Sequence, residues 1–242
     1  MSCAKNLAQP QRYVRAVFDA SAKSSSDVSL NELFLVGPTV HSTLVDVLIR
    51  FRSHRIALTT DVSKMYRAVG LVDSNKDLHC FVWRSSPDDS LCDYRMTRVT
   101  FGVAASSFAV NMSLQQNADN YAHEYPLAVK AVCDSFYVDD GLAGADSINK
   151  AIALQKELQE LFNRGNFLLR KWNSSSRSPS ELKVQQAVSS LPAAEEYSKT
   201  LGLEWNSHLD FFRLTISNIP SLRSLTKRAL VSDVAKIFDA LG

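Results

Sequence analysis

Apolar and polar residues alternate with two different periods along this chain. A two-residue period or a short continuous apolar run predicts strands at residues 13–20, 56–61, 79–83, 94–100, 131–138 and 168–172, and a hairpin of 201–205 with 211–216. A helical period predicts amphipathic helices at residues 41–52, 106–121, from Ser147 to Gly165, and 225–238. The order of these elements predicts an α+β fold of the split βαβ type, with helices packed on one side of the sheet.

Serine-rich polar stretches separate these elements and predict loops at residues 21–29, 85–90 and 174–180. The pair Asp88-Asp89 lies in one of these loops. Proline and serine residues surround the pair and no apolar strand flanks it, so we interpret it as part of a solvated turn.

The composition is that of an ordinary globular chain. With 242 residues, of which 45% are hydrophobic, the chain can bury the core of one large domain or two closely connected ones. The formal net charge of +2 neither requires nor excludes a nucleic-acid partner, and basic clusters at residues 50–55 and 223–228 are typical of solvated surfaces. The four cysteines and five histidines show no metal-ligand spacing.

The sequence contains no signal for a membrane. No apolar run reaches the roughly 20 residues that span a bilayer. The N-terminus lacks the apolar stretch of a signal peptide. We therefore expect no membrane partner and an intracellular, cytoplasmic location.

Acidic residues stand at the ends of two predicted strands. Asp61 ends the first, and Asp139 with Asp140 ends the second. If these strands are neighbours in a split βαβ sheet, three carboxylates meet on one sheet edge. Like charges about 4 Å apart repel by about 4 kcal/mol at an effective dielectric constant near 20, so the cluster indicates a bound cation. Magnesium prefers such oxygen ligands, and two magnesium ions suit in-line phosphoryl transfer.

Each acidic motif also has an ordinary structural explanation. Asp139-Asp140-Gly141 contains the Asp-Gly pair that is typical of a hairpin turn. Asp61 could instead cap a helix, which is a common position for aspartate. The residues alone leave these alternatives open.

Several blocks, in a fixed order, resemble the reverse transcriptases of retroelements. The run Phe136-Tyr137-Val138-Asp139-Asp140 is similar to the Tyr-x-Asp-Asp signature of that family. The other blocks that resemble the family are residues 60–66, 99–108, 165–172 and 201–205. Among reverse transcriptases, the sequences of these blocks are most similar to those of the BEL/Pao type of long-terminal-repeat retrotransposon. Residues 15–23, 225–228 and 235–239 also resemble that type.

The resemblance implies an RNA-directed DNA polymerase domain of a retrotransposon polyprotein. Its partners would be an RNA or DNA template with its primer, deoxynucleoside triphosphates, and the ribonuclease H, integrase and protease regions of the polyprotein. The implied fold is that of reverse-transcriptase fingers and palm, with a split βαβ (ferredoxin-like) palm sheet. Residues 1–205 would form this polymerase core, and residues 206–242 a hairpin end and the start of a thumb-like or connecting helix.

The resemblance also implies the catalytic residues. Asp61 and Asp139 would bind two Mg²⁺ ions, for which Mn²⁺ could substitute, and Asp140 would complete the acidic cluster. Lys171 is similar to the lysine that protonates the departing pyrophosphate or relieves its charge. An isolated lysine at this position would otherwise be read as a surface charge.

Four further residues are implied to bind the substrate. Arg15 would grip the triphosphate with its guanidinium. Tyr66 would exclude a ribose 2′-hydroxyl, although it could instead be a core aromatic. Phe101 and Gly102 belong to the block that contacts nucleotide and template. Thr100 stands where that block usually has proline, so this sequence departs from the family there.

The positions of the blocks imply truncated fingers and thumb. Because those regions supply most backbone contacts to a duplex, we expect template binding that is weak and sensitive to salt. The alternative is a catalytically inactive retroelement remnant that acts as a nucleic-acid-binding or protein-interaction module. A phosphatase or nuclease is disfavoured, because no water-activating or metal-binding histidine motif accompanies the acids.

Overall fold

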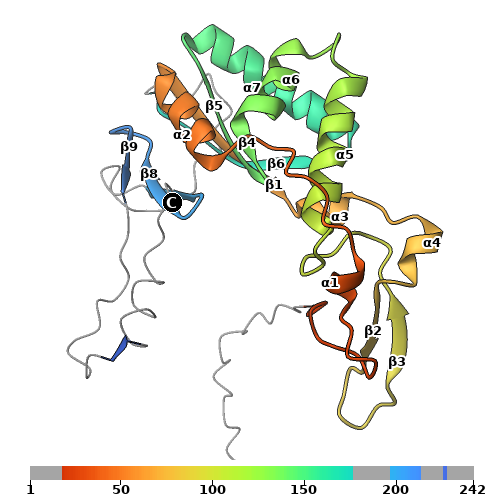
Figure 1. Cartoon of the computed structure of the whole chain (residues 1–242). Helices are drawn as coiled ribbons and strands as arrows, with labels where there is room; N and C mark the ends of the chain where they lie inside the picture. Colours follow the sequence, from red (N-terminus) through yellow and green to blue (C-terminus); the bar gives the residue numbers. More distant parts are fainter. Residues whose placement is uncertain (1–17, 177–196, 214–225, 228–242) are drawn as a thin grey trace, which may run out of the picture.

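The computed structural model describes residues 18–176, 197–213 and 226–227 (Figure 1). Arg15 lies outside the described residues. Of the helix predicted at 225–238, only residues 226–227 are described. Of the strand predicted at 13–20, only 18–20 are described, and these are not part of a strand. No helix among the described residues is long and apolar enough to cross a membrane.

A four-stranded antiparallel sheet forms the centre of the molecule. Its strands stand in the order β4 (Phe136–Tyr137), β5 (Asp140–Ala145), β1 (Ile56–Ser63) and β6 (Leu168–Ser174). Helical segments connect β1 to β4 and β5 to β6, while β4 and β5 form a hairpin. This order, with the first strand between the third and the fourth, agrees with the predicted split βαβ arrangement.

Three helices cover one face of this sheet. They are α5 (Ser106–Asn120), α6 (Pro126–Ser135) and α7 (Ile148–Arg164), which lie together in Figure 1. Their apolar residues form one core with Leu58 and Val62 of β1. The sheet is therefore anchored on this face by a continuous core.

The predicted start and end of α7 are confirmed. Ser147 is the N-cap, and its side chain accepts a hydrogen bond from the backbone N–H of Lys150. Gly165 is the C-cap. A side chain at Gly165 would collide with Asn117, whose amide donates to the carbonyl of Leu161 inside the same helix end. Glycine is thus required here for the close approach of α5.

A second, smaller core covers the opposite face. It joins Ala57 and Leu142 of the sheet to α2 (Leu44–Ser53) and to Trp205, which is fully buried. Trp205 lies in a three-stranded sheet of β7 (Tyr197–Thr200), β8 (Leu203–Asn206) and β9 (Phe211–Arg213). This sheet confirms the predicted hairpin of 201–205 with 211–216 in its described part and adds β7, which the sequence pattern did not predict.

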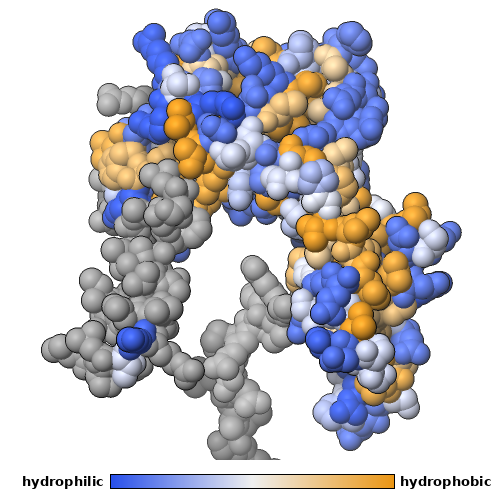
Figure 2. All heavy atoms as spheres, viewed as in Figure 1, coloured by the Kyte–Doolittle hydropathy of each residue, from blue (hydrophilic) through white to orange (hydrophobic). Residues whose placement is uncertain are grey.

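The remaining elements project from this body (Figure 1). They are α1 (Leu30–Leu33), α4 (Asp73–Lys76), and the hairpin of β2 (Cys80–Trp83) with β3 (Cys92–Arg95). Helix α3 (Met65–Ala68) instead packs against the main core, in which Met65 is buried. Figure 2 shows apolar side chains at the surface of this projecting part. Val82, Trp83, Leu91 and Tyr94 of the hairpin region are among its exposed apolar residues.

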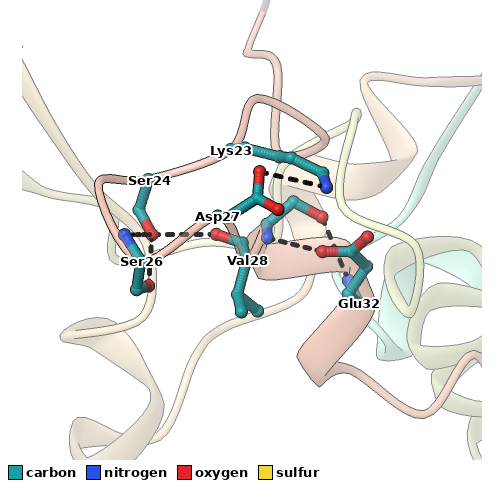
Figure 3. Close-up of polar contacts among 7 residues, drawn as sticks. Lys23, Ser24, Ser26, Asp27, Val28 and Glu32 are labelled. Carbon is teal, nitrogen blue, oxygen red and sulfur yellow. Dashed lines mark hydrogen bonds and ion pairs between the residues drawn. The ribbon is translucent and has the colours of Figure 1, made fainter.

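The loop predicted at residues 21–29 is held by polar contacts of its own (Figure 3). The Ser24 hydroxyl donates to the carbonyl of Val28 at 2.9 Å. Ser29 and Glu32 form a reciprocal capping box, in which the Ser29 backbone N–H donates to Glu32 Oε2 at 2.7 Å. The loop therefore gives a defined start to α1.

The strand predicted at 131–138 is wrong for most of its length. Residues 131–135 belong to α6, and only Phe136 and Tyr137 are extended. Ala128, Ala131, Val132 and Ser135 are buried at helical spacing, and Pro126 occupies the first turn, where proline favours a helix. A short apolar run does not distinguish a buried helix from a strand, which explains the error.

Candidate active site

Two neighbouring strands bring the acidic residues to one place in the sheet. In the β1–β5 ladder, Asp61 and Asp140 are direct partners. The backbone N–H of Val62 donates to the carbonyl of Asp139 at 2.7 Å. Residues directly opposite each other in an antiparallel pair have Cβ atoms about 4.5–5.5 Å apart on the same face. The convergence of Asp61 with the pair at 139 and 140 is therefore present at the level of the backbone.

A tight hairpin presents Asp139 at its tip. Phe136 pairs with Gly141 and Tyr137 pairs with Asp140, which leaves Val138 and Asp139 as the loop. Val138 has φ of +55°, which a β-branched side chain rarely adopts. Such strain persists only where the surrounding structure enforces it, and it concentrates at functional sites. The turn predicted at Asp140-Gly141 thus lies two residues earlier, at Val138-Asp139, and Asp140 and Gly141 begin β5.

The surroundings of Asp139 and Asp140 disfavour ionisation of both carboxyl groups. Partial burial, and then the charges of Asp139 and Asp61, raise the pKa of Asp140 to about 6, while the backbone of Leu201 acts in the opposite direction. Partial burial and the charge of Asp61 also raise the pKa of Asp139, which Lys171 lowers. A cation bound between these groups would favour their charged forms.

Lys171 supplies positive charge at the acidic edge. Its Nζ lies 3.1 Å from Oδ2 of Asp61, forming an ion pair between β6 and β1. The side chain of Asp61 is 25% exposed and that of Lys171 is 77% exposed. The residue that the family resemblance selected thus contacts one of the acids directly.

The described acidic residues do not form a complete metal site from protein side chains alone. Among the residues that the structure describes, no group of three or more His, Cys, Asp or Glu side chains is gathered closely enough to hold a metal ion. Magnesium is usually bound by one or two carboxylates, with water and substrate phosphates completing its octahedron. Asp61 on β1 and Asp139 in the turn before β5 carry hard oxygen donors of this kind.

Tyr66 and the 101–102 block lie on other elements. Tyr66 belongs to α3, five positions after Asp61, and its ring packs partly buried against the main core. Phe101 is 41% exposed, with its ring centroid 6.1 Å from that of Phe18. Gly102 has φ of +92°, and a side chain there would collide with the carbonyl of Phe18, so glycine is required.

Sequence reasoning missed two residues that support these segments. Asn31 brackets the glycine loop, because its Nδ2 donates to the Gly102 carbonyl at 3.2 Å and its Oδ1 accepts from the Ala104 N–H at 2.8 Å. His41 places its ring edge-to-face against Tyr137 of the acidic hairpin, at 4.6 Å between centroids. Neither residue belongs to a recognisable motif, since both act through contacts distant in sequence.

Two basic residues of α2 form contacts with other segments of the chain. The guanidinium of Arg50 donates to the Asp134 carbonyl at 3.0 Å and to the Ser42 hydroxyl at 3.1 Å. Arg52 pairs with Asp210, which also accepts from the indole N–H of Trp205. These two arginines connect α2 to neighbouring segments of the chain. Their contacts do not indicate a binding site for a polyanion.

Comparison with known proteins reveals a structural likeness. No family model and no curated protein matches the chain. Among solved structures, the foamy viral protease-reverse transcriptase dRH in complex with double-stranded DNA is similar, with a TM-score of 0.58 and 14% sequence identity. The match covers 86% of this chain and 31% of that chain, so the chain spans under a third of its neighbour. The chain therefore has a reverse-transcriptase-like fold.

Proposed function

We propose that this chain is the reverse transcriptase domain of a retrotransposon polyprotein of the BEL/Pao type. The observation that carries the proposal is the pairing of Asp61 with Asp140 across β1 and β5, with Asp139 on the adjoining strained turn. The pairing of two acids from distant parts of the sequence supports the proposal, because neither a simple turn nor a helix cap requires it. The central sheet would then be the palm, and the β2–β3 hairpin part of the fingers.

The acidic residues would hold two magnesium or manganese ions. Bound ions of this kind stabilise both the attacking and the leaving oxygen of an in-line phosphoryl displacement. Asp61 and Asp139 would supply the carboxylate ligands, while Asp140 would maintain the negative potential beside them. Lys171 would neutralise charge that develops on the departing pyrophosphate.

The substrates would be a primed RNA or DNA template and deoxynucleoside triphosphates. The structural neighbour is a reverse transcriptase in complex with double-stranded DNA, which is consistent with a nucleic-acid partner. Tyr66 would exclude the ribose 2′-hydroxyl from its partly exposed position on α3. The 101–102 loop, fixed by Asn31, would contact nucleotide and template. Arg15, outside the described residues, would bind the triphosphate.

A non-catalytic remnant that binds nucleic acid or protein is the second candidate. The specific observation in its favour is the ion pair between Lys171 and Asp61, which neutralises a carboxylate needed for metal binding. In this function the acids would serve only to pair strands and balance charge. The two candidates differ in whether carboxylate loss abolishes chemistry.

Primer extension on homopolymer RNA with a DNA primer, in magnesium or manganese, tests the proposal. Asp139→Asn should lower the rate at least about a thousandfold, because a ligand to catalytic metal contributes several kcal/mol to transition-state stabilisation. Asp88→Asn is the matched control, since this exposed aspartate lies in the turn between β2 and β3. It should keep the wild-type rate. Equal background incorporation by wild type and Asp139→Asn would exclude catalysis by this chain.

A further inference from the structure

A local irregularity in β6 directs Lys171 at the acids. The ladder between β1 and β6 shifts register between Thr59 and Asp61, so that one residue of β1 faces two residues of β6, Lys171 and Trp172. This is a β-bulge, a feature that re-aims side chains next to functional sites. The hydroxyl of Thr60 donates to the carbonyl of Arg170 at 2.9 Å, so a side-chain hydrogen bond links the two strands beside the bulge.

The backbone of the bulge is strained at Lys171 itself. This residue has φ of +53°, in the left-handed region where residues other than glycine are uncommon. The next residue, Trp172, is 4% exposed and belongs to the main core, which fixes the strand after the bulge. The core therefore holds the conformation that sends the ammonium of Lys171 to Asp61, 3.1 Å away.

Lys171 is paired with Asp61 although another basic residue stands opposite that acid in the ladder. Arg170, the preceding residue, has its Cα opposite Asp61 in the ladder and an exposed side chain. The residue opposite Asp61 in the ladder is therefore not the one that pairs with it. The bulge brings the next residue, Lys171, to the carboxylate of Asp61.

We propose that Lys171 is the resident counter-ion of the acidic site before metal binds, and that a divalent ion must displace its ammonium from Asp61. The inference rests on the proposed function, because it concerns the same metal site. Magnesium binds carboxylate oxygen at roughly 2.0–2.1 Å, so it competes with an ammonium that approaches the same carboxylate. The lysine stem is flexible, which allows the ammonium to leave without moving the strand.

Binding of Mn²⁺ to the full chain, followed by electron paramagnetic resonance of the free ion, measures this competition directly. Lys171→Gln removes the ammonium and should tighten Mn²⁺ binding roughly three- to tenfold, as expected for loss of one competing charge near the surface. Lys171→Met should do the same. Arg170→Gln removes an equal charge from the position opposite Asp61 in the ladder and should raise the affinity less than Lys171→Gln does, because among the described contacts the ion pair of Asp61 is made by Lys171.

Thermal unfolding in a chelator gives an independent measure. Without metal, Lys171→Gln should unfold at a lower temperature than the wild type, and added Mn²⁺ should stabilise this variant more than it stabilises the wild type. Lys171→Arg retains the charge and should remain close to the wild type in both respects. These measurements need no enzymatic turnover.

The outcomes separate this inference from the proposed function. Mn²⁺ binding that Asp61→Asn abolishes but Lys171→Gln leaves unchanged or weakens would overturn the counter-ion role and keep the metal site. In that case Lys171 would orient Asp61 or be an ordinary surface charge. Absence of Mn²⁺ binding in both wild type and Lys171→Gln would overturn the metal site, and this inference with it. Binding that appears only in Lys171→Gln would support the competition in its strongest form.

Discussion

The central sheet and the β2–β3 hairpin use the same antiparallel pairing under opposite conditions of burial. The first five residues of β1 are all buried, whereas all four residues of β3 are exposed. The central sheet has a core on each face. The hairpin is held by contacts near the surface, such as the stacked rings of Phe81 and Tyr94, the edge-to-face contact of Phe18 with Phe81, and the ion pair of Arg95 with Asp77.

This difference explains where the fold can hold strained backbone. Val138 and Lys171 both have positive φ. Val138 lies in the turn between β4 and β5, Lys171 lies within β6, and the main core anchors these strands. A left-handed conformation at such residues costs of order 1–3 kcal/mol each, which only a well-packed environment sustains. All four residues of β3 are exposed, so the hairpin lacks such an environment. The site requiring fixed geometry is thus on the better packed of the two regions.

The largest effect on stability is expected when an aromatic side chain is removed from the main core. Phe162 is fully buried, with its ring centroid 5.0 Å from that of Phe136, in the strand before the acidic turn. Phe162→Ala should lower the free energy of unfolding by about 4 kcal/mol, the usual range for a phenylalanine cavity. Urea unfolding followed by circular dichroism measures the change.

The matched variant for that test lies in the hairpin. Phe81 is only partly buried and stacks on Tyr94. Phe81→Ala should lower the free energy of unfolding by less than half as much as Phe162→Ala, because less apolar area leaves water there on folding. Equal losses at the two positions would show that the hairpin is part of the cooperative core, and the contrast between the regions would fail.

A smaller effect is expected from pH at the acidic edge. The pKa of Asp140 is raised to about 6 in the folded chain, above the value of about 3.9 for an unfolded chain. Between these values the folded state retains a proton that the unfolded state has lost, so the free energy of unfolding falls as pH rises. With allowance for solvent screening, the loss should be about 1–2 kcal/mol between about pH 4 and pH 7.

Asp140→Asn isolates this effect from other titrating groups. The variant cannot lose the proton, so in a chelator its free energy of unfolding should fall less than that of the wild type over the same pH range. Urea unfolding at several pH values gives both curves. Parallel curves would mean that the carboxyl of Asp140 is not perturbed by burial and by its acidic neighbours.

The sequence predicted elements whose boundaries have a local chemical cause. The cap residues Ser147 and Gly165 define α7, and the apolar run before Asp61 defines β1. It did not predict that residues 131–135 are helical, because a short apolar run fits either structure and the choice depends on packing against α7 and α5. β7 was missed because its pairing with β8 sets its conformation.

The candidate site shows the same division. The split βαβ pattern and the family resemblance both predict that the strands before Asp61 and before Asp139-Asp140 are neighbours. The proximity of these acids could therefore be predicted from the sequence. The contact of Lys171 with Asp61 depends on a bulge, and the contact of His41 with Tyr137 depends on a connecting loop. Neither feature has a signature in the sequence, since each arises from where distant segments meet.

The smallest expected effect is an isosteric exchange on the hairpin. Val82 is 59% exposed, so Val82→Thr places a hydroxyl in contact with water and should change the free energy of unfolding by less than about 0.5 kcal/mol. The same exchange at Val62, which is 1% exposed in β1, buries a hydroxyl and should lower it by about 2 kcal/mol. Urea unfolding compares the pair directly. A loss above about 1.5 kcal/mol at Val82 would indicate that another part of the chain covers the hairpin, because only burial makes this exchange costly.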